Sequence, residues 1–381
     1  MISASRYDVV IAGAGPAGAV AATVLARAGA RVLVLDRAQF PRGKLCGDTL
    51  NPGALAVLAR LGLESASSGA FPLDGMIVTG EGDVRVEGRY GGVHGRAILR
   101  RDFDAALVAA ARGAGATVDE GVLVDGPALD TSGAAPVVDG LMVRGKDRRL
   151  LRVGARVVIA ADGRYSRVAR AVQLSRSAFG PRRWAIGAYF EDVAGMRSFG
   201  EMHVRRNHYI GVAPLPSAVT NACVVTPSPS GRSMKQLLWD ALRADPLLRE
   251  RFASSRMITA PICLGPLAVD CEVAGTAGLL LAGDAAGFID PMTGDGLRFA
   301  LRGAELAAAE ALHALEQGVT DGHVRLLQAR RREFAHKWRF NRSLRTMVAF
   351  PGAVRVARYA AMLAPAGLQQ VIRYAGDVHA A

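Results

Sequence analysis

The fold is decided by the stretch Val9-Val10-Ile11-Ala12-Gly13-Ala14-Gly15-Pro16-Ala17-Gly18, an apolar run that leads directly into a G-x-G-x-x-G turn. An Ala-rich segment follows that should be helical to residue 28, where Gly29 ends it. A second apolar run at 31–35 then meets an acid, Asp36. A strand, a Gly turn, a helix, a strand and a carboxylate roughly 20 residues on are the full context of a dinucleotide-binding unit. We therefore predict a parallel sheet that binds a nucleotide at this turn.

Each glycine of the turn has its own physical reason. Gly13 permits the tight turn, Gly15 lets the backbone approach a pyrophosphate, and Gly18 lets the helix pack closely on the strand. The helix N-terminus offers unpaired N–H groups and a partial positive charge to the phosphates. Asp36 can accept a hydrogen bond from a ribose hydroxyl. The predicted contacts are Gly13, Gly15, Pro16, Ala17, Gly18, Asp36 and Arg37.

Composition limits the class of protein. The chain has 381 residues, of which 50% are hydrophobic, and this suffices for two closely packed domains. The net charge is +13, and only four of the 47 basic residues are lysines. Such an arginine excess fits either an anionic partner or an arginine-rich composition without functional meaning. No basic stripe interleaved with aromatic residues occurs, so no nucleic-acid partner is expected.

Cysteine usage and the apolar segments predict a cytoplasmic protein. Cys46, Cys223, Cys263 and Cys271 form no C-x-x-C pair, which suits free thiols in a reducing compartment. The sequence shows no signal-peptide pattern and no apolar run long enough to cross a bilayer. It also shows no paired Cys/His spacing, so we expect no metal site.

Changes of pattern along the chain predict two interleaved domains. Helical and buried-strand patterns at 1–70, 96–175 and 272–325 indicate a discontinuous nucleotide-binding domain, in which Asp102 would cap a helix. Period-two alternation at 71–95 and 176–271 indicates an antiparallel sheet that forms a substrate domain. Residues 326–381 should be helical and carry clustered arginines. That region would be a solvated cap, a peripheral membrane contact or a lid over an apolar tunnel.

Two further buried strands end in acids. Residues 156–161 lead into Asp162-Gly163, and residues 278–282 lead into Gly283-Asp284. Because ligands of parallel α/β sheets bind at the carboxyl ends of the strands, both ends should meet the first Gly turn at one ligand. Beyond the second acid, Gly294-Asp295-Gly296 opens a long helix. Its N-terminus would point at the same ligand.

This set of strand ends resembles the FAD-dependent oxidoreductases of the aromatic hydroxylase superfamily, over residues 6–60, 96–170 and 275–315. The resemblance implies an α/β fold: a Rossmann-like FAD-binding domain of the glutathione-reductase type, an interleaved antiparallel substrate domain and a helical C-terminus. It implies that Asp284 holds a ribityl hydroxyl, Arg101 lies near the pyrophosphate and Val122 lies by the adenine. A helix N-terminus would stabilise the charge of reduced flavin at its pyrimidine ring. The implied contacts in these later segments are Asp162, Gly163, Gly283, Asp284, Pro291, Gly294, Gly296 and Leu297.

Two longer motifs are similar to the geranylgeranyl reductase family. They are Phe40-Pro41-Arg42-Gly43-Lys44-Leu45-Cys46-Gly47-Asp48 and Gly283-Asp284-Ala285-Ala286-Gly287-Phe288-Ile289-Asp290-Pro291-Met292-Thr293-Gly294-Asp295-Gly296. In that family the cysteine matching Cys46 lies close to flavin and substrate, which implies that Cys46 and Gly47 contact the cofactor. On composition alone Cys46 is a small buried hydrophobe; the resemblance makes it the candidate catalytic residue.

The substrate sheet departs from that family at one motif. The aromatic Tyr-x-Trp-x-Phe-Pro stretch of the reductases is matched by Tyr209-Ile210-Gly211-Val212-Ala213-Pro214, which has small residues in place of the later aromatics. The Trp-x-Trp-x-Ile-Pro signature of the tryptophan halogenases, which share the fold, is absent.

Together these features predict an FAD-dependent oxidoreductase acting on an apolar, isoprenoid-, lipid- or polyketide-like small molecule. As a reductase it would deliver hydride to a C=C bond, with Cys46 or a bound water supplying the proton. The alternative is a monooxygenase that transfers one oxygen atom from O₂ to an aromatic or polyketide-like substrate. A third interpretation is a flavin-free prenyl carrier. No second G-x-G-x-x-G occurs, so electrons would come from transiently docked NAD(P)H or from another protein.

Overall fold

The parallel sheet predicted around the first strand is present. The computed structural model describes residues 7–81, 84–145, 149–177, 182–227, 229, 233–318, 321–349 and 364–378. The sheet contains β1 (Tyr7–Ala12), β2 (Val32–Asp36), β8 (Thr117–Glu120), β11 (Leu150–Ala160), β20 (Gly275–Thr276) and β21 (Leu279–Leu281), in the order β20-β21-β11-β1-β2-β8. All neighbours from β21 to β8 run parallel. β2 is buried along its whole length, as expected for a parallel strand covered on both faces.

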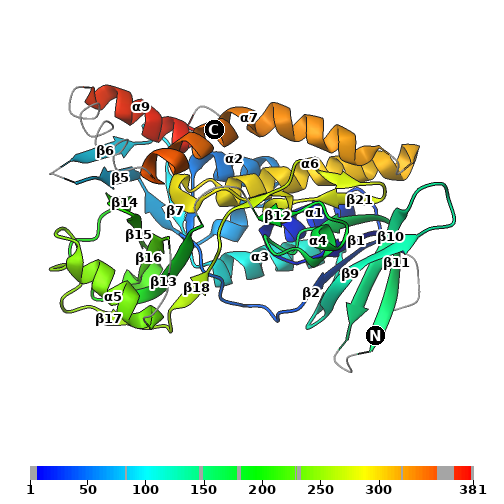
Figure 1. Ribbon diagram of the computed structural model, residues 1–381, viewed down its shortest axis with the longest axis horizontal. Coiled ribbons are helices and arrows are strands. Elements are labelled where there is room, and N and C mark those ends of the chain that lie inside the picture. The colour runs from blue at the N-terminus through cyan, green and yellow to red at the C-terminus, as the bar shows by residue number, and fades with distance from the viewer. Residues whose placement is uncertain are drawn as a thin grey trace.

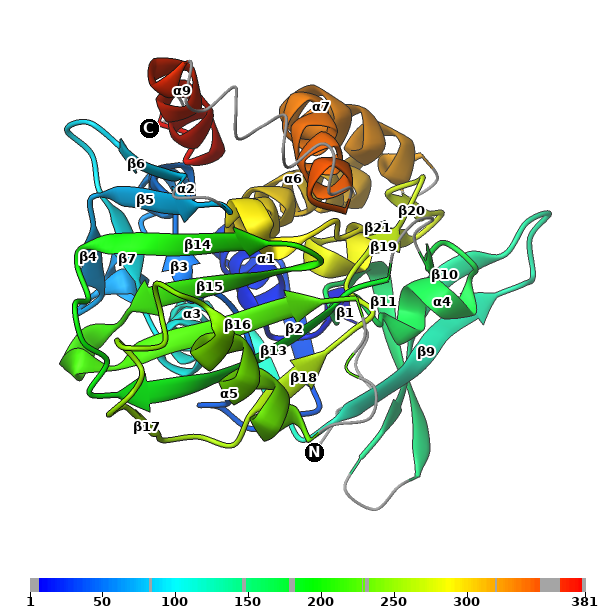
Figure 2. The ribbon, with the colours of Figure 1, turned by 60° about the vertical axis from the view of Figure 1, so that its left-hand side comes forward.

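Helices cover one face of this sheet and strands cover the other. α1 (Pro16–Arg27), α3 (Arg100–Gly113) and α6 (Gly296–Gln317) share a core with Val9 and Ile11 of β1. On the opposite face, β9 (Leu123–Asp130) and β10 (Val137–Arg144) form an antiparallel excursion with β11 and share a second core with Val10 and Ala12. Successive strand residues point to opposite faces, so β1 contributes to both cores. Figure 2 shows this excursion extending beyond the parallel sheet, with the short helix α4 (Arg167–Ala171) beside it.

A second large sheet is assembled from two separate parts of the chain. Its strands are β5 (Gly75–Thr79), β6 (Arg85–Arg89), β13 (Trp184–Glu191), β14 (Phe199–Arg205), β15 (His208–Pro214), β16 (Thr220–Thr226), β17 (Arg256–Met257) and β18 (Ile262–Leu264). The order is β17-β13-β16-β15-β14-β5-β6, and β18 also pairs with β13. Its pairs are antiparallel except for β14 with β5. α5 (Met234–Ala244) covers one face through Leu238 and Leu242.

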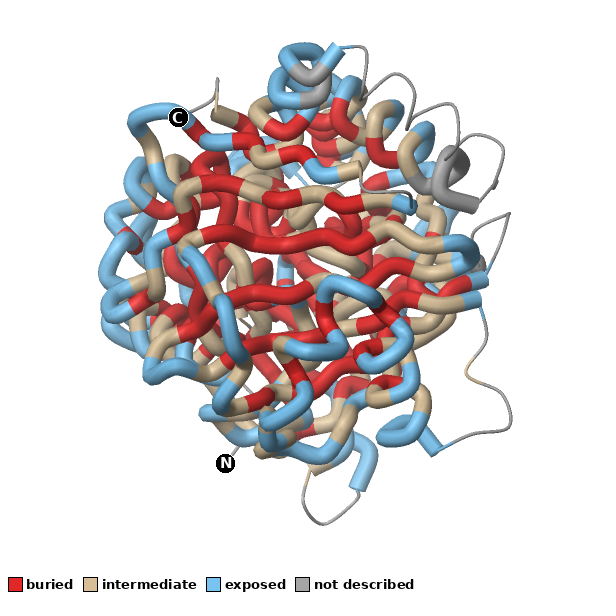
Figure 3. Tube along the Cα trace, turned by 90° about the vertical axis from the view of Figure 1, so that its left-hand side faces the viewer, coloured by how far each residue is buried: buried red, intermediate tan, exposed pale blue. Residues whose placement is uncertain are grey.

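Short elements connect the two large sheets. β3 (Thr49–Leu50), β7 (Gly95–Ala97) and β4 (Phe71–Leu73) form a small sheet, and β12 (Arg176–Ser177) pairs with β19 (Val269–Asp270). The described helices also include α2 (Pro52–Arg60), α4 (Arg167–Ala171), α7 (Gly322–Ala349), α9 (Pro365–Ala375) and the short turns η1 (Glu64–Ser67), η2 (Pro216–Ala218), η3 (Gly283–Ala286) and η4 (Pro291–Thr293). Figure 1 shows α7 along α6, and α9 beside β6. Figure 3 shows buried residues running along the strands and exposed ones in the connections.

The predicted fold class is confirmed, with one local difference. α3 begins at Arg100, so Asp102 lies in the first turn of the helix rather than at its cap. Its carboxylate is still placed at the positive end of the helix dipole. The domain boundaries stay predictions, and residues 350–363 of the expected C-terminal helical region lie outside the described residues. No described helix is both long enough and apolar enough to cross a bilayer.

We expect Gly18→Ala to destabilise the first βαβ unit strongly. A Cβ atom at position 18 would lie 1.8 Å from the carbonyl oxygen of Gly13, so backbone would have to move. Overpacking typically costs about 1–3 kcal/mol, and thermal denaturation should show a clearly lower Tm. The control is Gly113→Ala at the end of α3, where a Cβ meets no atom within 4 Å. Equal Tm values for the two variants would contradict the packing argument.

Candidate active site

Backbone hydrogen bonds join the carboxyl ends of four neighbouring parallel strands. They run from the Gly13 N–H to the Leu35 oxygen (2.7 Å), from the Ala161 N–H to the Ala12 oxygen (2.8 Å) and from the Ala282 N–H to the Ala160 oxygen (2.9 Å). The ends of β2, β1, β11 and β21 are therefore adjacent. The first Gly turn, Asp36, Asp162-Gly163 and Gly283-Asp284 consequently meet at one edge of the sheet, as the sequence predicts.

The Gly turn leaves its helix N-terminus open to an anion. Gly13 has a φ of +93°, and a Cβ there would lie 2.5 Å from the Ala161 carbonyl oxygen. Gly15 is the N-cap of α1, and Pro16 occupies the first helical position, where no N–H is needed. A Cβ on Gly15 would meet only the guanidinium of Arg42, at 3.5 Å. Arg42 thus adds positive charge beside the N–H groups that would bind phosphate.

Asp36, predicted to hold the ribose, organises the turn through both carboxylate oxygens. One carboxylate oxygen accepts from the Ala14 N–H and the other from the Ala38 N–H, both at 2.8 Å. The Asp36 carbonyl oxygen accepts from the Val122 N–H at 2.9 Å. Val122, the predicted neighbour of the adenine, is therefore attached to the end of β2. Arg37 is exposed.

Asp162 has one carboxylate oxygen ready for a ligand. Its Oδ2 accepts from the Arg167 N–H at 2.8 Å, while its Oδ1 is buried and has no hydrogen-bond partner in the structure as described. Burial raises the pKa of this carboxyl group. Gly163 has a φ of +87°, and a Cβ there would meet no atom within 4 Å. A buried acceptor without a partner, next to open space, fits a ligand that carries a hydroxyl.

The loop 40–48 brings Cys46 against a buried cation. Arg100 is 5% exposed and makes two hydrogen bonds of 2.8 Å to Asp104. Its positive charge also acts on the Cys46 thiol. Burial raises the pKa of the Cys46 thiol, although the Arg100 charge opposes the shift, so the thiol is protonated at neutral pH. Burial lowers the pKa of Lys44 in the same loop, and the charge of Asp284 acts against this shift.

Asp48 is a buried acid two residues beyond Cys46. It is fully buried and has a φ of +54°, a backbone conformation that residues other than glycine rarely adopt. Its carboxylate accepts from the Arg100 N–H at 3.2 Å, from the Asn221 amide and from the Tyr189 hydroxyl. Burial raises the pKa of Asp48 to about 7. At neutral pH this carboxyl group is therefore shared between its protonated and ionised forms.

The loop before α6 approaches the same edge from the other side. Gly283 has a φ of +59°, and a Cβ there would lie 2.8 Å from the Ala17 Cβ of α1. Gly294 has a φ of +69° and ends the turn η4, and α6 begins at Gly296. Leu297 is 5% exposed. Pro291 opens η4 after Asp290, whose carboxylate accepts from the Tyr209 hydroxyl at 2.6 Å.

An apolar face of the antiparallel sheet lies over both loops. Its buried residues include Ala185, Met202 and Val225, and Leu45 of the cysteine loop and Met292 of η4 belong to the same cluster. This face is opposite the one that α5 covers. The loop 40–48 and the loop before α6 therefore pack against an apolar face of the antiparallel sheet.

A pocket lies between the loop 283–290 and α7. Asp284, Phe288, Arg330, Trp338 and Asn341 are among its lining residues. Arg330 is buried, donates to the Ala286 carbonyl oxygen at 2.9 Å and lies 5.3 Å from the centre of the Trp338 ring. Burial lowers its pKa to about 10, so it remains a cation at neutral pH.

Among the predicted site residues, Arg101 is placed least favourably. Its side chain is 59% exposed and pairs with the adjacent Asp102, whereas Arg100 is buried beside Cys46. Gly47 is exposed within the cysteine loop. Arg42, Arg100 and Asp48 have no predicted role at the sequence level. The spacing of Arg100 and Asp104, four residues apart on a helix, indicates that the two side chains can pair, but it does not indicate that the pair is buried.

We expect Arg100→Met to lower FAD content and stability, and Arg101→Met to change neither. Breaking a buried ion pair by removing one partner costs up to about 3–5 kcal/mol. Asp104 is fully buried but keeps a second ion pair with Arg42 at 3.3 Å, so the loss should fall toward the lower end of that range. An exposed pair such as Arg101 with Asp102 contributes only about 0–1 kcal/mol. The flavin-to-protein absorbance ratio and Tm of both purified variants measure the difference. Flavin loss in Arg101→Met at unchanged Tm would instead support the predicted pyrophosphate contact.

The residues at the sheet edge fit FAD: a helix N-terminus with Arg42 for phosphate, a buried carboxylate at the end of β2 for ribose, and an acceptor on Asp162 without a partner. The FAD binding domain family matches residues 6–338. Menaquinone reductase of Mycolicibacterium smegmatis is 28% identical over 98% of this chain and 92% of its own length. Digeranylgeranylglycerophospholipid reductase 2 of Methanopyrus kandleri is 31% identical over 83% of this chain and 79% of its own.

Solved structures agree with this fold. That of a flavin-dependent brominase superimposes with a TM-score of 0.81 at 20% identity, and the match covers 98% of this chain and 94% of the brominase. The sheet edge, the family match and the reductase relatives lead to one assignment. The chain belongs to the FAD binding domain family and is an FAD-dependent oxidoreductase related to the geranylgeranyl reductases.

Proposed function

We propose that the protein uses FAD to reduce a C=C bond of an apolar, isoprenoid-like substrate. The observation that carries this proposal is the apolar face of the antiparallel sheet, against which Leu45 and Met292 pack. Both residues belong to loops of the cofactor site, so an apolar chain bound on this face would lie beside the FAD. Two relatives support the proposal, since their names assign them to menaquinone and to a digeranylgeranyl lipid.

The protein's part in the reaction is to hold and deliver a proton. Bound FAD, once reduced, supplies a hydride to one carbon of the double bond, and the other carbon must take a proton. The Cys46 thiol is protonated at neutral pH because it is buried. The positive charge of Arg100, which acts to lower the pKa of this thiol, would stabilise the thiolate left after proton transfer. Asp48 lies two residues beyond Cys46 and has a pKa of about 7, so it would return a proton to the thiolate.

One position of the apolar face favours a substrate with a bulky end. Gly211 follows Tyr209 by two residues and so shares its face of the sheet. A Cβ there would meet nothing closer than 4.0 Å. Because the geranylgeranyl reductases carry an aromatic residue in this motif, the glycine leaves space that a ring or headgroup could fill.

The proposal includes an electron donor and a membrane contact. We propose that NAD(P)H docks transiently at the edge of the flavin and leaves again, without a domain of its own. Arg331, Arg332 and Arg339 are exposed on α7. Such a row of cations would hold a cytoplasmic enzyme against an anionic membrane, where an isoprenoid substrate is dissolved.

The alternative function is a monooxygenase, because a site that excludes water also protects oxygen transfer to an apolar substrate. Product analysis separates the two functions. We expect the reduced holoenzyme, with a digeranylgeranyl lipid and without O₂, to give a product heavier by two hydrogens. With menaquinone the two added hydrogens must lie in the side chain, because reduction of the quinone ring alone gives the same mass. In D₂O the carbon that takes the proton should carry deuterium, and the carbon that takes the hydride should carry it as well where the N–H of reduced flavin has exchanged with solvent before transfer. A product that forms only with ¹⁸O₂ and contains ¹⁸O would establish the monooxygenase instead.

We expect Cys46→Ala to lower turnover steeply, by about 100-fold or more, because general acid catalysis typically contributes 10²–10⁴-fold. Flavin content should stay normal, since the alanine keeps the loop apolar. Stopped-flow absorbance at the flavin band measures the rate of flavin oxidation by substrate. Cys263→Ala is the matched control, because that thiol lies on β18 at the sheet edge. Unchanged turnover in Cys46→Ala would return Cys46 to a packing role.

A further inference from the structure

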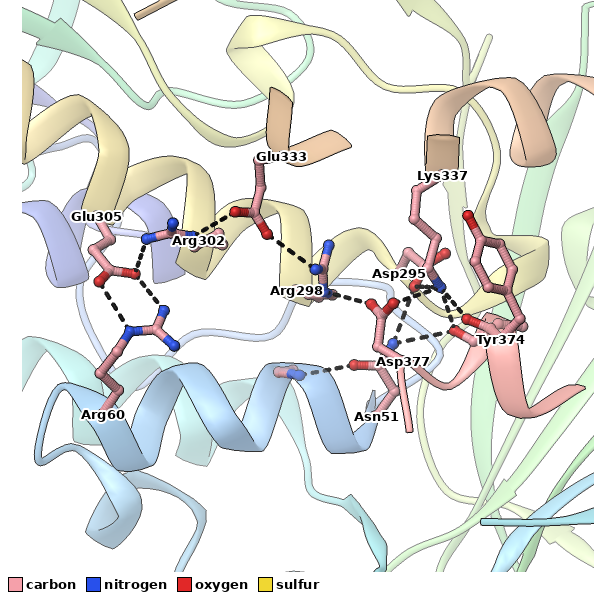
Figure 4. Close-up of polar contacts among 12 residues, drawn as sticks. Asn51, Arg60, Asp295, Arg298, Arg302, Glu305, Glu333, Lys337, Tyr374 and Asp377 are labelled. Carbon is pink, nitrogen blue, oxygen red and sulfur yellow. Dashed lines mark hydrogen bonds and ion pairs between the residues drawn. The ribbon is translucent and has the colours of Figure 1, made fainter. Parts of the chain in front are cut away.

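A chain of alternating charges runs from the N-terminus of α6 to the protein surface (Figure 4). Its members, in order, are Asp295, Lys337, Asp377, Arg298, Glu333, Arg302, Glu305 and Arg60. The Lys337 ammonium lies 3.3 Å from Asp295 and 3.1 Å from Asp377. Side-chain exposure falls from 48% at Arg60 to 1% at Asp295. The pairs at the Asp295 end are therefore screened least by solvent.

The turn at 374–377 is attached at this buried end. Lys337 donates to the carbonyl oxygens of Tyr374 at 2.5 Å and Ala375 at 2.9 Å. Its ammonium also lies 4.9 Å from the centre of the Tyr374 ring. Asn51, the N-cap of α2, donates to Asp295 at 3.0 Å and to the Ala375 carbonyl oxygen at 3.5 Å. The Lys337 ammonium and the Asn51 amide thus join the turn at 374–377 to Asp295, the residue that precedes α6.

Asp295 occupies a sensitive position because α6 begins at the next residue. Reduced flavin gains negative charge near its pyrimidine ring, where this helix N-terminus is expected to point. An ionised Asp295 would repel that negative charge, and the Lys337 ammonium offsets the charge of Asp295. Burial raises the pKa of Asp295, while the Lys337 charge acts to lower it and the Asp377 charge to raise it. The balance between Lys337 and Asp377 therefore sets how much negative charge lies beside the cofactor.

We propose that the turn at 374–377 is a positioning element of the FAD site, which holds Lys337 between Asp377 and Asp295 and so sets FAD affinity and the flavin reduction potential. The proposal depends on the position of FAD given above and not on the identity of the substrate. A purely structural role for these ion pairs would change the stability of the protein and leave the flavin potential as it is.

The test measures the potential and the FAD dissociation constant of full-length holoenzyme variants in the absence of any substrate. Lys337→Met should make the flavin harder to reduce and raise the dissociation constant by about 5- to 150-fold, the usual range of coupling between sites. Asp377→Asn should shift the potential in the opposite direction, because Lys337 then pairs with Asp295 alone. The double variant Asp295→Asn/Lys337→Met should bring the potential back toward that of the unmodified protein. Equilibration with a redox dye gives the potential, and fluorescence of released FAD gives the affinity.

The control is Arg144→Met, which removes an exposed ion pair with Asp125 on the β9–β10 excursion; it should leave potential and affinity unchanged. Shifts of Lys337→Met and Asp377→Asn in the same direction, or no shift in either folded variant, would overturn the proposal. Should Lys337→Met fail to fold, Asp295→Asn decides, since removing that carboxylate must raise the potential. Because no substrate is present, a failure of the proposed reductase activity leaves these readouts unaffected.

Discussion

Hydrogen bonds between the ends of β1, β2, β11 and β21 are the constraint on which the site depends. The N–H groups of Gly13, Ala161 and Ala282 each donate to a carbonyl oxygen of the neighbouring strand, and this holds the strand ends together. Such close approach leaves no room for side chains at Gly13 or Gly18. The same approach brings Asp36 and Asp162 to the mouth of the first turn. An adaptable ligand pocket could tolerate side chains there, but a sheet edge in which backbone meets backbone cannot.

Around this edge, the polar groups of the site are buried and only partly neutralised. Arg100 has Asp104 as its partner, whereas Asp48 relies on an amide, a hydroxyl and a backbone N–H. Burial raises the pKa of Asp48 to about 7, and the hydrogen bonds to its carboxylate and the nearby Arg100 charge offset this effect only in part. The positive φ of the same residue adds strain. Charge and strain thus concentrate in the loop that carries Cys46, where proton transfer is proposed.

The sequence predicted the elements well where one short segment contains the whole reason for its structure. The apolar run and the glycine turn specify β1, α1 and β2, and the acids after β11 and β21 follow from strand ends. Side chains whose position depends on distant segments could not be read in this way. Arg100 and Arg101 have the same composition around them, and only the packing of α3 decides which is buried. Asp48 meets Asn221, and Lys337 meets Tyr374, because separate elements converge in three dimensions.

The order of strands in the parallel sheet has a consequence for biosynthesis. The central strand β11 is flanked by β1 on one side and by β21 on the other, and β21 is translated after the whole antiparallel sheet. A nascent chain that has left the ribosome as far as β18 therefore holds an open sheet edge. At about 5–20 residues per second, that edge waits for about one to three seconds before its last strand emerges. Until β21 pairs with β11, the unfinished edge presents unpaired N–H and C=O groups, which are a template for pairing with another strand.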